Sequence, residues 1–228
     1  MTDESRGIGT QPLPIMAMLR SATLEHHQRA EAALSDLISL EAPTRAIYTT
    51  TLVRLAGWYF PLEDRLSKAA RSLASIGVMW ADRRKSPSLI ADLSALGYHG
   101  SIEVCNALPP VMTLPQAVGC LYVLEGATLG GQIVVRLLRA APEMPRDPGF
   151  RFFSGYEERT ASMWRTFGAA VSTSVERSRV EHHTAIRAEI VTSAQATFDS
   201  LMIWLCARAR PTPEQAAIPV SELSLASH

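Results

Sequence analysis

Apolar residues in this sequence recur at three- and four-residue steps over long stretches, and this spacing constrains the fold more than any other feature. The longest stretch runs from Leu114 to Ala140, with Thr113 and Pro115 at its start and Pro142 just beyond its end. Such a period predicts a helix with one buried face, and threonine followed by proline is typical of a helix N-terminus. No stretch alternates apolar and polar residues convincingly, as a half-buried strand would. We therefore expect an all-α fold.

The same spacing predicts further helices over residues 19–38, 45–73, 87–96, 154–176 and 180–209. Proline has no N–H group and clashes with the preceding turn, so Pro61 should kink or break the second of them. Ser86 should cap the third helix and Gly97 should end it. Helices this unequal and interrupted do not make a regular four-helix bundle.

Length and composition predict a single domain. The chain has 228 residues, of which 47% are hydrophobic, and can bury a full core. We expect residues 1–13 to be a disordered segment, residues 14–210 to form the domain, and residues 211–228, with their three prolines, to be a flexible tail.

Charge and targeting features argue against nucleic acid and membrane partners. Basic and acidic residues both number 22, so the net charge of zero gives no overall attraction to nucleic acid. The run Arg83, Arg84 and Lys85 is expected to be a solvated helix end or loop. The polar N-terminal segment has no apolar secretory core, and no uninterrupted apolar stretch reaches about 18 residues, which predicts a cytoplasmic protein. Its three cysteines lie mostly among apolar residues and indicate buried thiols in a reducing compartment.

The segment LRSATLEHHQRAE contains the first candidate site residues. Arg20, His27 and Glu31 are seven and four residues apart, so on one helix they share a face. A histidine that binds iron through one ring nitrogen needs an acceptor for the proton on the other, and Glu31 could accept it. Arg20 could meet a carboxylate of the ligand. The alternative is an exposed helix face on which His27 and Glu31 merely pair in water, and this segment alone does not decide between the two.

The segment LYVLEGATLGGQ contains the second candidate set. Gly126, Gly130 and Gly131 lie inside an apolar helical run, where each costs about 0.5–1 kcal/mol relative to alanine. Glycine lets another body approach the backbone, and that body is either a neighbouring helix or a planar ligand over which the helix bends.

Together these two segments resemble those of the heme oxygenase family, and the similarity extends from about Met16 to Arg210. The family's proximal helix has a threonine four residues before its ligand histidine and a glutamate four residues after it, matched here by Thr23, His27 and Glu31. This register selects His27 over its neighbour His26.

The glycines resemble those of the family's distal helix, which is kinked at positions matched by Gly126, Gly130 and Gly131. The segments RRKSPSLIADLSALG, FFSGYEERTASMW and ATFDSLMIW resemble the bacterial branch, and LEGATLGG resembles the heme oxygenases that accompany bacterial phytochromes.

The resemblance implies a single-domain fold of several helices with heme between a proximal and a kinked distal helix. It also implies oxygen-dependent cleavage of heme to biliverdin with release of carbon monoxide and iron. Heme b is then both substrate and cofactor, molecular oxygen is consumed, and electrons come from ferredoxin or another external donor protein. A bacteriophytochrome is a candidate recipient of the biliverdin. The residues implied to bind the cofactor are Arg20, Thr23, His27 as iron ligand, Glu31, Ala127, Tyr156, Arg159, Trp164 and Phe198, and the glycines at 126, 130 and 131 form the catalytic wall.

Four of these positions have weaker support. Tyr156, Arg159 and Trp164 are spaced by three to five residues in an expected helix and could reach the heme edge, with Arg159 as a second propionate partner. Phe198 resembles a residue that lines the pocket. The aromatic residues would equally serve as ordinary core.

One position departs from the family pattern. Most well-known members have an aspartate directly after the first distal glycine, where it orders the water that protonates bound oxygen, and this chain has Ala127 there. Glu125 is two residues away, about 200° around a helix, and so does not replace it. Two hypotheses follow: a heme-degrading oxygenase, or a non-catalytic heme carrier or sensor on the same scaffold. A helical enzyme acting on another small molecule is a more remote third.

Overall fold

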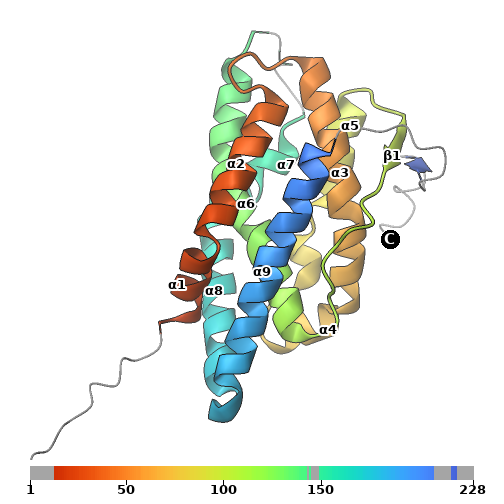
Figure 1. The fold of residues 1–228 in the computed structure, drawn as a ribbon. Helices are drawn as coiled ribbons and strands as arrows, with labels where there is room; N and C mark the ends of the chain where they lie inside the picture. The colour runs from red at the N-terminus through yellow and green to blue at the C-terminus, as the bar shows by residue number, and fades with distance from the viewer. Residues whose placement is uncertain (1–12, 143, 145–148, 208–216, 220–228) are drawn as a thin grey trace, which may run out of the picture.

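The structure is a computed structural model that describes residues 13–142, 144, 149–207 and 217–219. The described residues are helical almost throughout, which confirms the all-α prediction (Figure 1). In chain order the elements are α1 (Ile15–Ala22), α2 (Leu24–Ile38), α3 (Arg45–Lys68), α4 (Ala70–Ser75), the 3-10 turn η1 (Trp80–Arg83), α5 (Ser86–Ala95), β1 (Ser101–Glu103), α6 (Leu114–Ala140), α7 (Arg151–Ser154), η2 (Glu157–Arg159), α8 (Thr160–Arg177), η3 (Val180–His182), α9 (His183–Cys206) and β2 (Ala217–Pro219).

Helices α6 and α9 pack along each other at the centre of the fold (Figure 1). Helices α1, α2 and α8 lie on one side of this pair, and α3, α4 and α5 lie on the other. Fully buried side chains join the layers into one core, among them Trp58 of α3, Leu121 of α6 and Phe167 of α8. Helix α6 is long and apolar enough to cross a membrane, but 61% of its most apolar window is buried inside the fold, as in a core helix.

Pro61 lies inside α3 and does not end it, contrary to the expected break. The Gly57 carbonyl, which residue 61 of a regular helix would bond, instead accepts the N–H of Cys105 at 2.8 Å. Gly57 also admits the end of β1, because a Cβ on it would collide with the carbonyl oxygen of Glu103. A distant segment thus replaces the hydrogen bond that the proline removes.

The two N-terminal caps that the sequence suggests have different outcomes. Ser86 is the first residue of α5 rather than its cap, and its hydroxyl donates to Glu63 Oε2 at 2.6 Å. The Glu63 carboxylate, from α3, accepts the N–H groups of Lys85 and Ser86 and so caps α5 from outside. The prediction for α6 is confirmed, since Thr113 Oγ1 accepts the N–H of Gln116 at 3.2 Å.

Residues with positive φ follow several of the helices, including α5 and α7. Gly97 has a φ of 69° just after α5, where the sequence predicts the stop. Gly155 and Glu157 have φ values of 60° and 54°, so the stretch expected as one helix over 154–176 divides into α7, η2 and α8. The last helix, expected from residue 180, begins at His183 after η3.

A two-stranded antiparallel sheet joins β1 to β2, with Ser101 opposite Pro219, Ile102 opposite Ile218 and Glu103 opposite Ala217. The sequence shows no strand here because three residues are too few to display alternation. Strand β2 falls within the stretch expected as a flexible tail. The other residues of that tail from 211 onward, and residues 1–12, lie outside the described residues.

The three cysteines are free thiols, as expected, but they do not share one environment. Cys105 and Cys120 are buried, whereas Cys206 is exposed at the end of α9. The expectation of buried thiols is therefore wrong for Cys206.

Candidate heme site

The stretch expected as one helix from residue 19 to 38 is divided at Thr23 into α1 and α2. Thr23 is buried, and its hydroxyl donates to the Leu19 carbonyl at 2.8 Å. The backbone N–H of Thr23 donates to the same Leu19 carbonyl. The backbone departs from helical geometry at Thr23, where this side-chain hydrogen bond forms. Arg20 therefore lies on α1, and only His27 and Glu31 lie on α2, which corrects the expectation of one common helix face.

His27 lies on the accessible side of α2, with 48% of its side chain exposed. Its Nδ1 is 3.4 Å from Glu31 Oε2, one turn further along the helix. Its ring forms a T-shaped contact with Phe198 of α9, with 6.2 Å between the ring centroids. His26 is turned instead toward Asp199, with 3.7 Å between Nε2 and Oδ1, and only 19% of its side chain is exposed. Of these adjacent histidines, His27 alone combines an accessible ring with a carboxylate one turn away.

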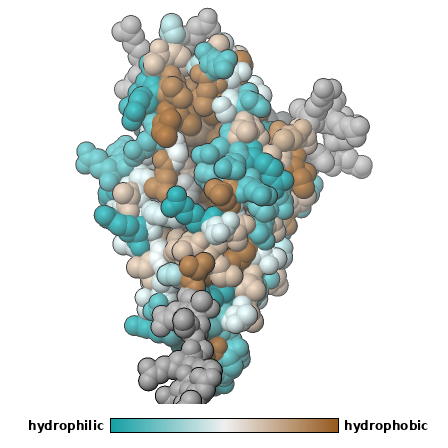
Figure 2. All heavy atoms as spheres, turned by 60° about the vertical axis from the view of Figure 1, so that its left-hand side comes forward, coloured by the Kyte–Doolittle hydropathy of each residue, from teal (hydrophilic) through white to brown (hydrophobic). Residues whose placement is uncertain are grey.

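The second half of α6 exposes an apolar face. Gly126, Gly130, Ile133 and Leu137 fall within an arc of about 60° around the helix, and Leu129 lies beside them. The side chains of Leu129, Ile133 and Leu137 are 43%, 60% and 42% exposed. Figure 2 turns this side of the molecule forward and shows hydrophobic surface gathered toward its upper end. An exposed apolar face of this kind marks a binding surface more often than solvated helix.

The glycines at the centre of this face leave room beside the helix backbone. A Cβ on Gly130 would meet no atom of the described residues within 4 Å apart from its own helix and chain neighbours. A Cβ on Gly126 would lie 3.9 Å from the Trp164 ring of α8 and touch nothing closer. The backbone of α6 can therefore be approached directly here.

Helix α9 packs against both α2 and α6 and so joins the helix of His27 to the helix of the glycines. It crosses α6 at Gly119, where a Cβ would lie 2.5 Å from the Ile190 carbonyl oxygen and 2.6 Å from Ser193 Cβ. Gly119 lies on the same face of α6 as Gly126 and Gly130 but two turns earlier. The packing that fills this face at Gly119 is absent at Gly130 among the described residues, so the two helices leave the face open there.

Gly131 does not belong to the open face. It is buried about 100° further around α6, where a Cβ would collide with the carbonyl oxygen of Phe153 in α7. Gly131 is therefore a packing glycine, which corrects its expected place in the ligand wall.

Tyr122 and Trp164 lie below Gly126, with 5.5 Å between their ring centroids. Burial raises the pKa of Tyr122, and the neighbouring Thr23 hydroxyl and Arg20 cation act in the opposite direction. The junction of α1 and α2 thus meets α6 at Tyr122, about one turn before Gly126.

Ala127 is exposed, whereas Glu125 is buried with 1% of its surface accessible. This agrees with their expected separation around the helix. The carboxylate of Glu125 points into a cluster behind α6 that the sequence does not reveal.

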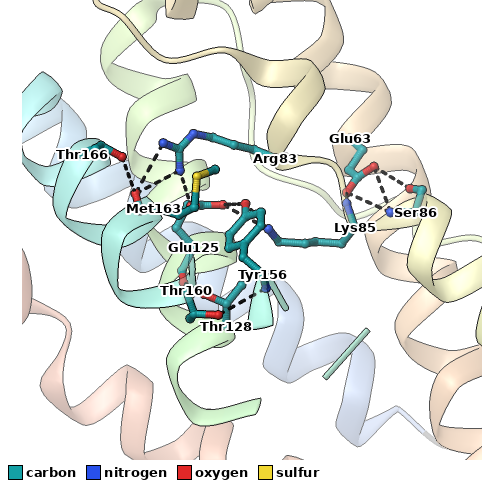
Figure 3. Close-up of polar contacts among 10 residues, drawn as sticks. All are labelled: Glu63, Arg83, Lys85, Ser86, Glu125, Thr128, Tyr156, Thr160, Met163 and Thr166. Atoms are coloured by element: carbon teal, nitrogen blue, oxygen red, sulfur yellow. Dashed lines mark hydrogen bonds and ion pairs between the residues drawn. The ribbon is translucent and has the colours of Figure 1, made fainter. Parts of the chain in front are cut away.

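The cluster contains two members of the basic run, which the sequence interpretation placed in solvent. Arg83 and Lys85 are each only 4% exposed, so that interpretation is wrong for both. Both form ion pairs with Glu125, and Lys85 Nζ lies 3.1 Å from Glu125 Oε1 (Figure 3). Burial lowers the pKa of Lys85 while the Glu125 carboxylate opposes that shift.

Tyr156 belongs to the same cluster. Its hydroxyl donates to Glu125 Oε1 at 2.5 Å and accepts from Lys85 Nζ (Figure 3). Tyr156 precedes η2 and Arg159 is its last residue, whereas Trp164 lies on α8. The prediction that all three lie on one helix is therefore wrong. Arg159 is exposed, and its proposed contact with a propionate stays a prediction.

The residues of α2 and of the exposed face of α6 fit heme. A single imidazole holds iron when the iron brings its other ligands in a porphyrin, and Glu31 can fix the tautomer of His27 through Nδ1. The apolar face of α6 suits the porphyrin surface, and Gly130 leaves space for a flat ligand against the backbone. Arg20, exposed beside Tyr122, can meet a propionate.

Comparisons with known proteins identify the family of the chain. The family profile described as heme oxygenase matches residues 13–207. A heme oxygenase of Xanthomonas campestris pv. campestris (strain 8004) is 34% identical over 162 residues, which cover 69% of this chain and 85% of that protein. The heme oxygenase structure from Leptospira interrogans superposes with a TM-score of 0.65 at 18% identity, covering 85% of this chain and 98% of that one, and supports the fold. The chain therefore belongs to the heme oxygenase family and is a heme-degrading enzyme.

Proposed function

We propose that the chain binds heme between α2 and α6 and cleaves it to biliverdin, releasing carbon monoxide and iron. Molecular oxygen is consumed, and ferredoxin or another external reductant supplies the electrons. The observation that carries the proposal is the pairing of an accessible His27, held by Glu31, with an open glycine face on α6, both backed by α9.

On the proximal side, His27 Nε2 would hold the iron. Nδ1 would donate its proton to Glu31, which lies 3.4 Å away and orients the ring. Phe198 packs against the ring and limits its rotation. Arg20 would pair with a propionate, because its guanidinium is suited to a carboxylate and it lies beside Tyr122.

On the distal side, the backbone at Gly126 and Gly130 would lie over the heme face. The bound heme supplies the iron at which oxygen is reduced and the macrocycle that is opened. The chain's own contribution would be to hold the backbone of Gly126 and Gly130 close to the heme face and to exclude bulk water with Leu129, Ile133 and Leu137. Ala127 is exposed and carries no acid, so its side chain cannot relay a proton here.

The direct test mixes the purified protein with hemin, then adds oxygen with ferredoxin and its reductase. We expect a Soret band that decays as biliverdin and carbon monoxide form. A stable Soret band without bilin would indicate the heme carrier or sensor instead. Failure to bind hemin would refute the site itself.

The matched histidine variants test the ligand assignment. His27→Ala should lose axial coordination, seen as loss of the six-coordinate ferric spectrum, while His26→Ala should retain it because its ring faces Asp199. Loss of coordination in His26→Ala alone would overturn the assignment.

The resemblance of LEGATLGG to phytochrome-associated members supports a role in the cytoplasm as a supplier of biliverdin to a bacterial phytochrome. Coupling the reaction to a bacteriophytochrome apoprotein should yield its red-absorbing holoprotein. No chromophore transfer from active enzyme would refute this role while leaving heme cleavage intact.

A further inference from the structure

A buried ionic cluster lies directly behind the glycine face of α6. Arg83, Lys85 and Tyr156 converge on the Glu125 carboxylate, which is 1% exposed (Figure 3). Arg83 pairs with Oε2, while Lys85 and Tyr156 both bond Oε1, at 3.1 and 2.5 Å. Three groups from two separate parts of the chain therefore determine where the Glu125 carboxylate lies.

This cluster is a poor choice for stability alone. Burying ions costs several kcal/mol each before pairing, and apolar side chains of similar size often stabilise a fold equally well. The bonds to Glu125 instead fix its position, because they tie its carboxylate to η1, to the residue before α5 and to the residue before η2. Arg83 additionally donates to the Met163 carbonyl of α8 at 3.4 Å, which ties that helix to the same point.

The anchored carboxylate is next in sequence to the glycine face. Glu125 precedes Gly126, about 100° away around the helix, so holding Glu125 inward holds Gly126 and Gly130 outward. Trp164, which follows the Met163 carbonyl, is the side chain nearest Gly126. A rotation of α6 by about 10° would move its backbone by about 0.4 Å at a radius of about 2.3 Å. Misplacement by about 1 Å can cost a hundredfold in rate, so even small rotations matter.

We propose that Glu125, held by Tyr156, Lys85 and Arg83, is the positioning residue that sets the rotation of α6 and hence the distance between its glycine backbone and the heme. The inference rests on the proposed placement of heme between α2 and α6. Glu125 acts through α6 and touches neither heme nor oxygen.

Tyr156→Phe tests this with little risk to folding, because it removes one hydroxyl and leaves both ion pairs in place. Tyr48→Phe is the matched control, since Tyr48 is also a tyrosine whose hydroxyl donates to an oxygen inside the fold, the Gly149 carbonyl at 2.6 Å. In the apoprotein, amide hydrogen exchange over residues 126–133 should accelerate about tenfold in Tyr156→Phe and stay as in the wild type in Tyr48→Phe.

The variants Tyr156→Phe and Tyr48→Phe also distinguish an effect on hemin binding from an effect on kcat. Tyr156→Phe should keep its hemin dissociation constant within about threefold while kcat falls about tenfold, because His27 and the apolar face still bind the ring but the distal wall is displaced. Exchange rates and kcat matching those of Tyr48→Phe would overturn the proposal. If hemin fails to protect residues 126–133 in the wild type, the placement of heme is wrong, and this outcome is distinct from failure of the positioning role.

A second pair uses the two buried carboxylates. Glu125→Gln should shift the spectrum of the azide-bound ferric heme, which reports the distal surroundings, whereas Glu63→Gln should not. Glu63 is equally buried, at 2% exposed, but it caps α5 rather than holding α6. If Glu125→Gln does not fold, the tyrosine pair still decides. Equal shifts in both carboxylate variants would refute the role of Glu125.

Discussion

Two adjacent glycines in α6 should respond to the same substitution with opposite changes in stability. Gly130 and Gly131 are both helical, so alanine favours the helix at each by about 0.5–1 kcal/mol. Their surroundings differ, because Gly130 faces open space and Gly131 faces the backbone of α7. The sign of the change therefore depends on what the new methyl group meets.

At Gly130 the methyl group meets nothing within 4 Å among the described residues beyond its own helix, so the helix preference is gained in full. With a shift of about 2–4 °C per kcal/mol for a domain of this size, the melting temperature of apo Gly130→Ala should rise by about 1–4 °C. The same methyl group enters the proposed heme wall, so turnover should fall.

At Gly131 the methyl group would collide with the Phe153 carbonyl oxygen and lie 3.1 Å from its carbon. Backbone cannot rotate aside as a side chain can, and such overpacking costs about 1–3 kcal/mol. A collision with backbone falls in the upper half of this range, so after the helix preference is subtracted apo Gly131→Ala should lose about 1–2.5 kcal/mol, which corresponds to about 2–10 °C.

Thermal unfolding of the two apo variants, followed by circular dichroism, measures both shifts, and hemin titration with a turnover assay measures function. The reasoning is refuted if Gly130→Ala is destabilised as much as Gly131→Ala, because Gly130 would then be in contact with protein. Unchanged turnover in Gly130→Ala would separately remove this glycine from the heme wall.

Three further predictions follow from other contacts. Glu31→Ala should weaken hemin binding about tenfold, because outer partners of a metal-binding histidine commonly contribute that much, and unchanged affinity would mean that the histidine is oriented otherwise. Cys206 should react first with a thiol reagent in the native protein, because burial raises the pKa of Cys105 and Cys120, and early labelling of either would contradict their burial. Asp92→Ala should cost about 1–3 kcal/mol in urea unfolding, since it leaves two N–H groups at the start of α7 without their acceptor, and a loss below about 0.5 kcal/mol would show that water replaces it.

Local patterns predict most of the helices and the proximal side of the site. The apolar period gives α6 its bounds, and Thr113 caps it as expected because a cap depends only on residues within the same turn. The four-residue spacing of His27 and Glu31 likewise survives in α2, since it needs no information from elsewhere in the chain.

The contacts that the sequence does not predict join residues far apart along the chain. Arg83 and Lys85 look solvated because their acceptor, Glu125, is about forty residues away, and Pro61 looks disruptive because Cys105 supplies the missing bond. The only local sign of the cluster is a single carboxylate within the apolar run LYVLEG, where an unpaired Glu125 would be costly.

The separation of the glycines, by contrast, can be worked out from helix geometry alone. Successive residues differ by about 100°, so Gly126 and Gly130 must share a face that Gly131 leaves. By the same geometry Gly119, seven residues before Gly126, lies on this face as well. It lies about 10 Å before Gly126 along the axis of α6. Glycine at 119 lets α9 approach closely, and glycine at 126 and 130 meets no such neighbour. One face of α6 therefore first brings α9 close and then, about three turns later at Gly130, faces open space among the described residues, which is the geometry that a flat ligand between α6 and α2 requires.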